Sequence, residues 1–112
     1  MAFEPVLAAD ELWIGEMRGV MVHGRRVLVL RTEDGVHAYE DRCAHLGLPL
    51  SLGKLEGGVI TCPAHHYQYD ACSGCGVNPE RVRLRPYPVR VSEGEIAVDV
   101  DAAVERAAEE RA

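Results

Sequence analysis

Two short pairs of cysteine and histidine constrain this chain more than any other feature of its sequence. Cys43 is followed two positions later by His45, and Cys62 three positions later by His65, with sixteen residues between the pairs. A thiolate and an imidazole within a few residues of each other converge readily on one metal site. Two soft thiolates and two imidazoles suit either tetrahedral zinc or an iron–sulfur cluster. The sequence therefore predicts a metal centre held by two separate loops.

The distribution of donors between the two pairs favours an iron–sulfur cluster. Zinc ribbons and fingers usually pair cysteine with cysteine and histidine with histidine. Here each pair contributes one thiolate and one imidazole, which fits a cluster in which one iron takes two cysteines and the other takes two histidines. That is the ligation of a Rieske-type [2Fe–2S] cluster, with four ligands in this chain: Cys43, His45, Cys62 and His65. Structural zinc at the same residues is the alternative.

The residues around these ligands resemble the Rieske family. Four segments near the ligand pairs match the family pattern: Leu46–Pro49, Tyr69–Asp70, Ser73–Gly74 and Pro86–Pro88. Four more are similar to the ferredoxin component of toluene and other aromatic monooxygenases: Trp13–Met17, Glu56–Cys62, Gly76–Pro79 and Tyr87–Val89. The resemblance covers nearly all of residues 1–100.

The resemblance implies an all-β Rieske fold, in which antiparallel sheets form a sandwich with a small cluster-binding subdomain inserted at about residues 41–85. Runs rich in β-formers predict strands at 26–31, 36–40, 58–61, 86–91 and 95–100. We expect the cysteine- and histidine-rich stretches 41–52 and 63–79 to be loops on that scaffold. Residues 1–101 should form one domain and residues 102–112 a flexible C-terminal tail.

The resemblance also implies an electron carrier with no catalytic residues of its own. One Rieske-type [2Fe–2S] cluster would pass electrons from a flavin-containing NADH reductase to a diiron hydroxylase, in a monooxygenase system of aromatic hydrocarbon catabolism. The nearest alternative is the ferredoxin of an aromatic-ring dioxygenase system. A zinc-binding module and a cluster-free Rieske-fold interaction module are alternatives of a different class. The presence of all four ligands argues against a cluster-free module.

Composition narrows the choice of partners. With 12 basic and 18 acidic residues the net charge is −6, which argues against nucleic acid and suits a carrier whose partners present positive patches. The sequence contains no apolar run long enough to span a bilayer, and its first residues lack the pattern of a signal peptide. We expect a cytoplasmic protein, monomeric when free, that binds neither nucleic acid nor a membrane.

Several other residues near the ligands have a structural interpretation. Cys72 and Cys75 form a Cys-x-x-Cys segment, which we expect to carry free thiols in a loop. His66 adjoins a ligand but should point away from it, because adjacent residues on an extended chain face opposite sides. We expect Trp13 to be a packing anchor. Three tyrosines near the loops are expected to keep water away from the cluster: Tyr67, Tyr69 and Tyr87.

Departures from the high-potential branch of the family predict the reduction potential. Those proteins join their ligand loops by a disulfide, whereas Leu48 and Ala64 stand at the corresponding positions here. They also place a serine where this chain has Tyr67. Fewer hydrogen bonds to sulfur make it harder to add an electron, so we expect a low potential.

The family resemblance also predicts where partners dock. They should meet an exposed histidine edge framed by three segments: Leu46–Pro49, His66–Tyr67 and Pro86–Pro88.

Overall fold

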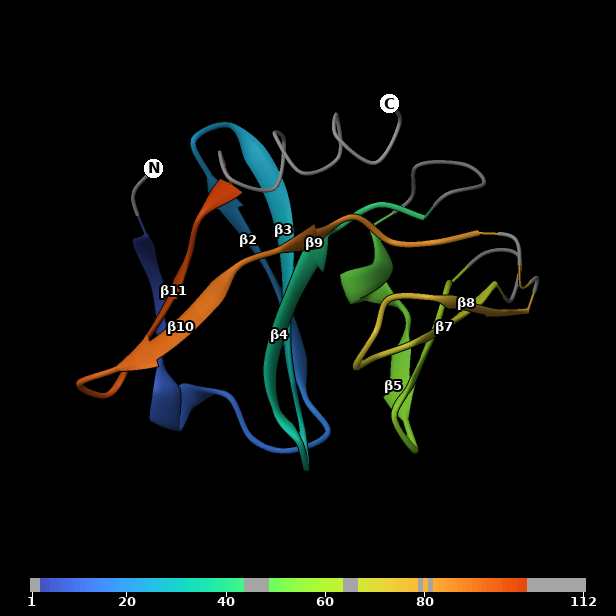
Figure 1. Cartoon of the computed structure of the whole chain (residues 1–112), viewed down its shortest axis with the longest axis horizontal. Helices are drawn as coiled ribbons and strands as arrows, with labels where there is room; N and C mark the ends of the chain where they lie inside the picture. The colour runs from blue at the N-terminus through green and yellow to red at the C-terminus, as the bar shows by residue number, and fades with distance from the viewer. Residues whose placement is uncertain (1–2, 44–48, 64–66, 79, 81, 101–112) are drawn as a thin grey trace.

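Three antiparallel sheets, arranged one beside the next, make up most of the described chain (Figure 1). The computed structural model describes residues 3–43, 49–63, 67–78, 80 and 82–100. In spatial order, the first sheet contains β1 (Glu4–Ala8), β11 (Glu95–Val98) and β10 (Val89–Ser92). The second contains β2 (Met17–Val22), β3 (Arg25–Thr32), β4 (Gly35–Glu40) and β9 (Pro86–Tyr87). The third contains β5 (Lys54–Glu56), β6 (Val59–Thr61), β7 (Gln68–Asp70) and β8 (Gly76–Asn78).

The second sheet lies between the other two, and its strand β3 is buried on both faces. Along β3, Val27 and Val29 belong to the core shared with the first sheet, and Leu28 and Leu30 to the core shared with the third. Side chains alternate between the faces of a strand, so an uninterrupted apolar run is what a strand with two buried faces requires. The described residues therefore form two hydrophobic cores, one on each side of this sheet.

The order of the strands along the chain confirms the predicted all-β architecture of antiparallel sheets. The four strands of the third sheet are inserted between β4 and β9, which pair with each other in the second sheet. Two short 3₁₀ turns, η1 (Ala9–Glu11) and η2 (Leu50–Leu52), complete the described elements. In the described part of the chain, no helix is long and apolar enough to cross a membrane.

The predicted strand at 86–91 is in fact two strands in two different sheets. β9 pairs with Ala38 and Tyr39 of β4, and after Pro88 the chain continues as β10, which pairs with β11. Proline has no N–H to donate to a strand ladder, so Pro88 is a natural point for the chain to change sheets.

The stretch 63–79, which we expected to be a loop, contains two strands. β7 and β8 pair with each other there, and each is only three residues long. A segment this short shows too little alternation to be recognised from sequence. The predicted C-terminal tail, 102–112, lies outside the described residues.

Candidate metal centre

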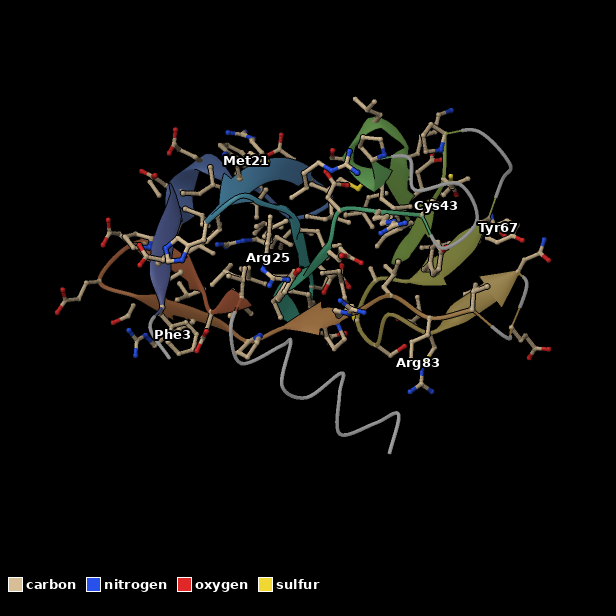
Figure 2. All side chains as sticks on the ribbon, turned by 90° about the horizontal axis from the view of Figure 1, so that it is seen from above. Phe3, Met21, Arg25, Cys43, Tyr67 and Arg83 are labelled. Atoms are coloured by element: carbon tan, nitrogen blue, oxygen red, sulfur yellow. The ribbon has the colours of Figure 1, made fainter. Side chains whose placement is uncertain are left out.

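The first ligand loop leaves the end of β4, and Cys43 lies near its base. The Cys43 side chain is only 1% exposed and belongs to the core between the second and third sheets. In Figure 2 it lies at the same end of the molecule as Tyr67, far from Phe3. His45 and the rest of residues 44–48 lie outside the described part of the chain.

A buried carboxylate closes this first loop. Asp41 is 3% exposed, and its two carboxylate oxygens accept hydrogen bonds from the Ser51 backbone N–H at 2.9 Å and from the Ser51 hydroxyl at 2.7 Å. The Asp41 backbone N–H donates to the carbonyl of Arg26 in β3 at 3.0 Å. Residues 41 and 51 are thus held together across the loop that carries Cys43 and His45.

Gly19 of β2 packs directly against this clamp. A Cβ at position 19 would stand 2.7 Å from the Ser51 hydroxyl oxygen and 2.8 Å from a carboxylate oxygen of Asp41. Any larger side chain would therefore push the two partners apart. Glycine is the residue that allows β2 to approach the loop this closely.

The second ligand loop is the connection of a β-hairpin. Thr61 of β6 pairs with Gln68 of β7, and between them the Cys62 N–H donates to the Tyr67 carbonyl at 2.7 Å. The hairpin fixes Cys62 at the base of its loop, where the side chain is 2% exposed and lies in the same core as Cys43. His65 lies outside the described residues.

Tyr69 provides a hydrogen-bonding group for one of the thiols. Its hydroxyl oxygen lies 3.6 Å from the sulfur of Cys43, and both side chains are buried. A metal-bound thiolate would have no proton to give, so with Cys43 as a cluster ligand the phenol would be the donor. The sequence does not distinguish Tyr69 from Tyr67 and Tyr87, because only the fold places Tyr69 beside Cys43.

The prediction that Tyr87 keeps water away from the cluster is wrong. Tyr87 is buried in the core between the first and second sheets, on the opposite side of the middle sheet from both cysteines. It neither shields the cluster nor offers a surface to partners. Its pairing partner across the ladder, Ala38, belongs to the same distant core.

The Cys-x-x-Cys segment is separate from the two buried cysteines. Cys72 and Cys75 carry free, exposed thiols, as the sequence predicted. The Cys72 sulfur lies 3.3 Å from a carboxylate oxygen of Asp34 and 3.6 Å from the Thr32 hydroxyl. The hydrogen bond with Thr32 lowers the pKa of Cys72, but burial and the carboxylates of Asp34 and Asp70 outweigh it, so the pKa is raised.

The described residues fit a Rieske-type cluster. Two separate loops deliver one buried thiol each to a single core, and a buried hydroxyl lies within reach of one of them. Each loop continues from its cysteine toward a histidine in the sequence. Within the described ranges no three candidate ligands gather to form a different metal site. The assignment of His45 and His65 as ligands remains a prediction.

Two loops that each bring a buried cysteine to one core are what a small metal-cluster protein of this type requires. The comparisons specify which kind of protein it is. The model of the Rieske [2Fe–2S] domain matches residues 2–88. The chain belongs to this family, and its cofactor is one Rieske-type [2Fe–2S] cluster.

Several relatives are ferredoxins of oxygenase systems. The ferredoxin component of the alkene monooxygenase system of Xanthobacter autotrophicus is 37% identical over 97 residues, covering 86% of this chain and 80% of the relative. The structure is similar to the ferredoxin of carbazole 1,9a-dioxygenase from Nocardioides aromaticivorans IC177, with a TM-score of 0.80, 30% identity and coverage of 88% and 97%.

A solved complex of reduced oxygenase and oxidized ferredoxin in carbazole 1,9a-dioxygenase contains a second similar chain. Its TM-score is 0.79 at 37% identity, and the match covers 86% of this chain and 91% of that chain. This chain is accordingly a Rieske ferredoxin, a carrier of electrons rather than a catalyst, of the kind that serves oxygenase systems.

Proposed function

We propose that this ferredoxin passes single electrons from an NADH-dependent flavin reductase to the diiron hydroxylase of a monooxygenase acting on toluene-like aromatics. The observation that carries the proposal is the match to an alkene monooxygenase ferredoxin, which spans 86% of this chain and 80% of the relative. The diiron character and the aromatic substrate class rest on the family resemblance of four segments: Trp13–Met17, Glu56–Cys62, Gly76–Pro79 and Tyr87–Val89.

We further propose Cys43, His45, Cys62 and His65 as the cluster ligands. When bound, a Rieske cluster accepts and releases one electron at a time. The chain's own residues prepare that site by holding two sulfurs in a core from which water is excluded. Exclusion of water and oxidants protects thiolate sulfur from stepwise oxidation.

The surface beside the first loop supports docking near the predicted histidine edge. A shallow groove of about 300 Å³ lies there, and its rim includes Met21, Pro49 and Leu52. Met21 and Leu52 are both large apolar side chains that are mostly exposed. Because Tyr87 is buried, we place the docking face on this side of the first loop rather than at Pro86–Pro88. Covering an apolar face of this kind with a partner costs little desolvation free energy.

A second candidate is the ferredoxin of an aromatic-ring dioxygenase. It is favoured by the likeness to two carbazole 1,9a-dioxygenase ferredoxin chains, at TM-scores of 0.80 and 0.79. The electron chemistry of the two candidates is the same, and only the acceptor differs.

Reconstitution with purified components separates the two candidates. The holo ferredoxin is combined with an NADH-dependent flavin reductase and either a diiron hydroxylase or an aromatic-ring dioxygenase, and product is followed against NADH consumption. We expect hydroxylated product only with the diiron hydroxylase, and none when Cys43→Ser replaces the wild type. Efficient coupling to the dioxygenase alone would overturn the monooxygenase assignment.

A further inference from the structure

Trp13 is not the packing anchor that the sequence suggested. Its side chain is 71% exposed, and the next residue, Ile14, is 63% exposed. The loop that carries them is nevertheless rigidly held. The Trp13 indole N–H donates to the Asp10 carbonyl at 3.1 Å, and its backbone N–H donates to the Glu16 carboxylate at 2.8 Å. The Gly15 N–H donates to the Arg31 carbonyl at 2.9 Å, which ties the loop to β3.

An exposed tryptophan in a fixed orientation is a typical anchor of protein–protein recognition. Tryptophan and arginine dominate the few residues that carry most of the binding energy of an interface. Holding the side chain in place before binding reduces the entropy lost when the complex forms. Neither hydrophobic core formed by the described residues includes Trp13, so packing among those residues does not account for it.

A cleft of about 450 Å³ opens beside this loop. Its lining comes from four separate turns and the residues next to them: Ile14, Gly15, Arg31–Asp34, Leu55, Gly57–Gly58 and Cys72. Ile14 and Leu55 give it an apolar part, and the hairpin turns of β3–β4 and β5–β6 form two of its walls. Figure 1 shows both turns at the lower edge of the molecule.

The rim of the cleft is acidic. Glu33 and Asp34 line it, and Asp70 accepts a hydrogen bond from the backbone N–H of Cys72, another lining residue, at 2.8 Å. Among the described lining residues the one basic side chain is Arg31, whose guanidinium donates to the Ala9 carbonyl at 3.1 Å. Apolar side chains beside two carboxylates suit a partner segment that combines an apolar residue with lysine or arginine. Trp13, which precedes the lining residue Ile14 in sequence, presents an exposed ring that offers a cation–π contact to the flank of such a segment.

The cleft and the two buried cysteines lie at opposite ends of the strands that connect them. The β3–β4 turn precedes β4, and Cys43 follows the end of that strand; the β5–β6 turn precedes β6, and Cys62 follows the end of that strand. From Gly35 to Glu40, β4 spans roughly 17 Å at the usual rise per residue. A partner seated at the cleft therefore leaves the other end of these strands uncovered, and the surface is suited to holding the carrier.

We infer that this cleft, with Trp13 and Ile14 beside it, is a second docking surface that binds a basic segment of the oxygenase. The inference rests on the proposed role of the chain as an oxygenase ferredoxin. A ferredoxin bound through this cleft keeps the edge of its cluster accessible, first to the reductase and then to the oxygenase.

The number of electrons that monooxygenation consumes explains why the oxygenase is the partner that benefits from keeping the ferredoxin bound at this surface. Monooxygenation follows RH + O₂ + 2 e⁻ + 2 H⁺ → ROH + H₂O, with NADH as the ultimate reductant. A carrier with one cluster delivers these electrons singly, so an oxygenase that has received the first must wait for the second. Binding the ferredoxin through the cleft, away from the ligand loops, raises its effective concentration at the oxygenase during that interval. The cluster can still be reduced by the reductase.

Trp13 itself provides the probe, because it is the only tryptophan in the chain. Ferredoxin labelled with 5-fluorotryptophan gives one ¹⁹F resonance, which reports on this surface whatever tryptophans the partners contain. We expect the resonance of the oxidised holo protein to shift or broaden when the diiron hydroxylase is added, and to stay unchanged with the reductase alone.

Two variants keep the probe and change the surface. Glu33→Lys with Asp34→Lys should raise the dissociation constant for the hydroxylase by about tenfold, and Ile14→Ala should raise it less. The matched controls are Glu93→Lys with Glu95→Lys on the β10–β11 turn and Val91→Ala on β10, all at exposed positions outside the cleft. Both controls should bind like wild type, and all proteins should accept electrons from the reductase at the same rate.

The outcomes separate this inference from the proposed function. Calorimetric binding of the hydroxylase with an unchanged ¹⁹F resonance, or with equal affinity for the cleft and control variants, would overturn the docking surface alone. A resonance that responds to the reductase, or to ferredoxin concentration without any partner, would also overturn it. If the wild type neither binds the hydroxylase nor supports hydroxylation, the proposed function fails and the inference fails with it.

Discussion

At the scale of single residues, Tyr69 is placed to influence the redox chemistry if Cys43 is a cluster ligand, as we propose. Its hydroxyl lies 3.6 Å from the Cys43 sulfur, and both side chains are buried. Donation to a ligand sulfur offsets part of the negative charge that reduction adds, and so raises the potential. Tyr69 would thus partly compensate for the missing serine, at whose position this chain has Tyr67.

Tyr69→Phe should lower the reduction potential of the cluster. One net hydrogen bond of about 1 kcal/mol corresponds to roughly 40 mV for a one-electron couple. Protein-film voltammetry on the wild type, which we expect near the low end of the Rieske range at about −150 mV, provides the reference. Tyr87→Phe is the control, because that hydroxyl lies in the other core. An equal or higher potential in Tyr69→Phe would show that this hydrogen bond does not tune the cluster.

Asp34→Asn should make Cys72 more reactive. The Asp34 carboxylate helps to raise the pKa of this thiol, so removing the charge lowers the pKa and increases the thiolate fraction near neutral pH. Iodoacetamide alkylation, followed by mass spectrometry in a Cys75→Ser background, should therefore be several-fold faster at pH 7.5. Glu33→Gln, which removes a neighbouring charge without touching the sulfur, should have a smaller effect. Slower alkylation of Asp34→Asn would refute the electrostatic explanation.

At the scale of elements, the clamp between Asp41 and Ser51 joins β3, the first ligand loop and η2. Gly19 lets β2 pack against the same two residues. The spacing of Cys43 and His45 within the loop is local, and sequence alone predicts it. The clamp depends on residues ten positions apart and on a neighbouring strand, so no local sequence pattern predicts it.

Ser51→Ala should destabilise the first ligand loop. The substitution leaves a buried carboxylate oxygen of Asp41 without its 2.7 Å donor. A hydrogen bond to a charged group is worth about 1.5–3 kcal/mol, so the urea midpoint should fall and the visible absorbance of the cluster should bleach earlier. Ser92→Ala on exposed β10 is the control. Identical midpoints and bleaching in both variants would mean that the clamp does not support the loop.

The middle sheet shows how far local sequence predicts this fold. The apolar run at 26–31 and the alternating run at 36–40 correspond to β3 and β4, since long, strongly patterned strands depend little on context. β7 and β8 were missed because three-residue strands are specified by their neighbours. The division of 86–91 at Pro88 depends on which sheet each half pairs with, and that is a property of the whole chain.

At the scale of the whole molecule, the two proposed docking surfaces lie at opposite ends of β4. One end leads to Cys43 and the groove with Pro49, and the other to the cleft beside Trp13. The ligand pattern predicted the first surface through the family resemblance. The second was missed because a lone tryptophan in a short sequence more often packs inward, and only the fold shows it exposed.

Pro49→Glu should reduce electron delivery while leaving the cluster intact. A carboxylate at this position places an unpaired charge in the apolar groove that a partner would have to desolvate. Stopped-flow oxidation of the reduced ferredoxin by the hydroxylase should slow by about tenfold. Val91→Glu, at an exposed site on β10, should behave like wild type. Full activity of Pro49→Glu with an unaltered EPR spectrum would place the docking face elsewhere.

The central claim is that one cluster is held by two cysteines and two histidines, and pulsed EPR on the reduced protein tests it most directly. We expect about two irons and two inorganic sulfides per chain, with nitrogen hyperfine coupling from two imidazoles. Each of His45→Cys and His65→Cys should lose one of these couplings. A colourless protein that contains zinc, a cluster without nitrogen coupling, or an unchanged spectrum in either histidine variant would contradict the account.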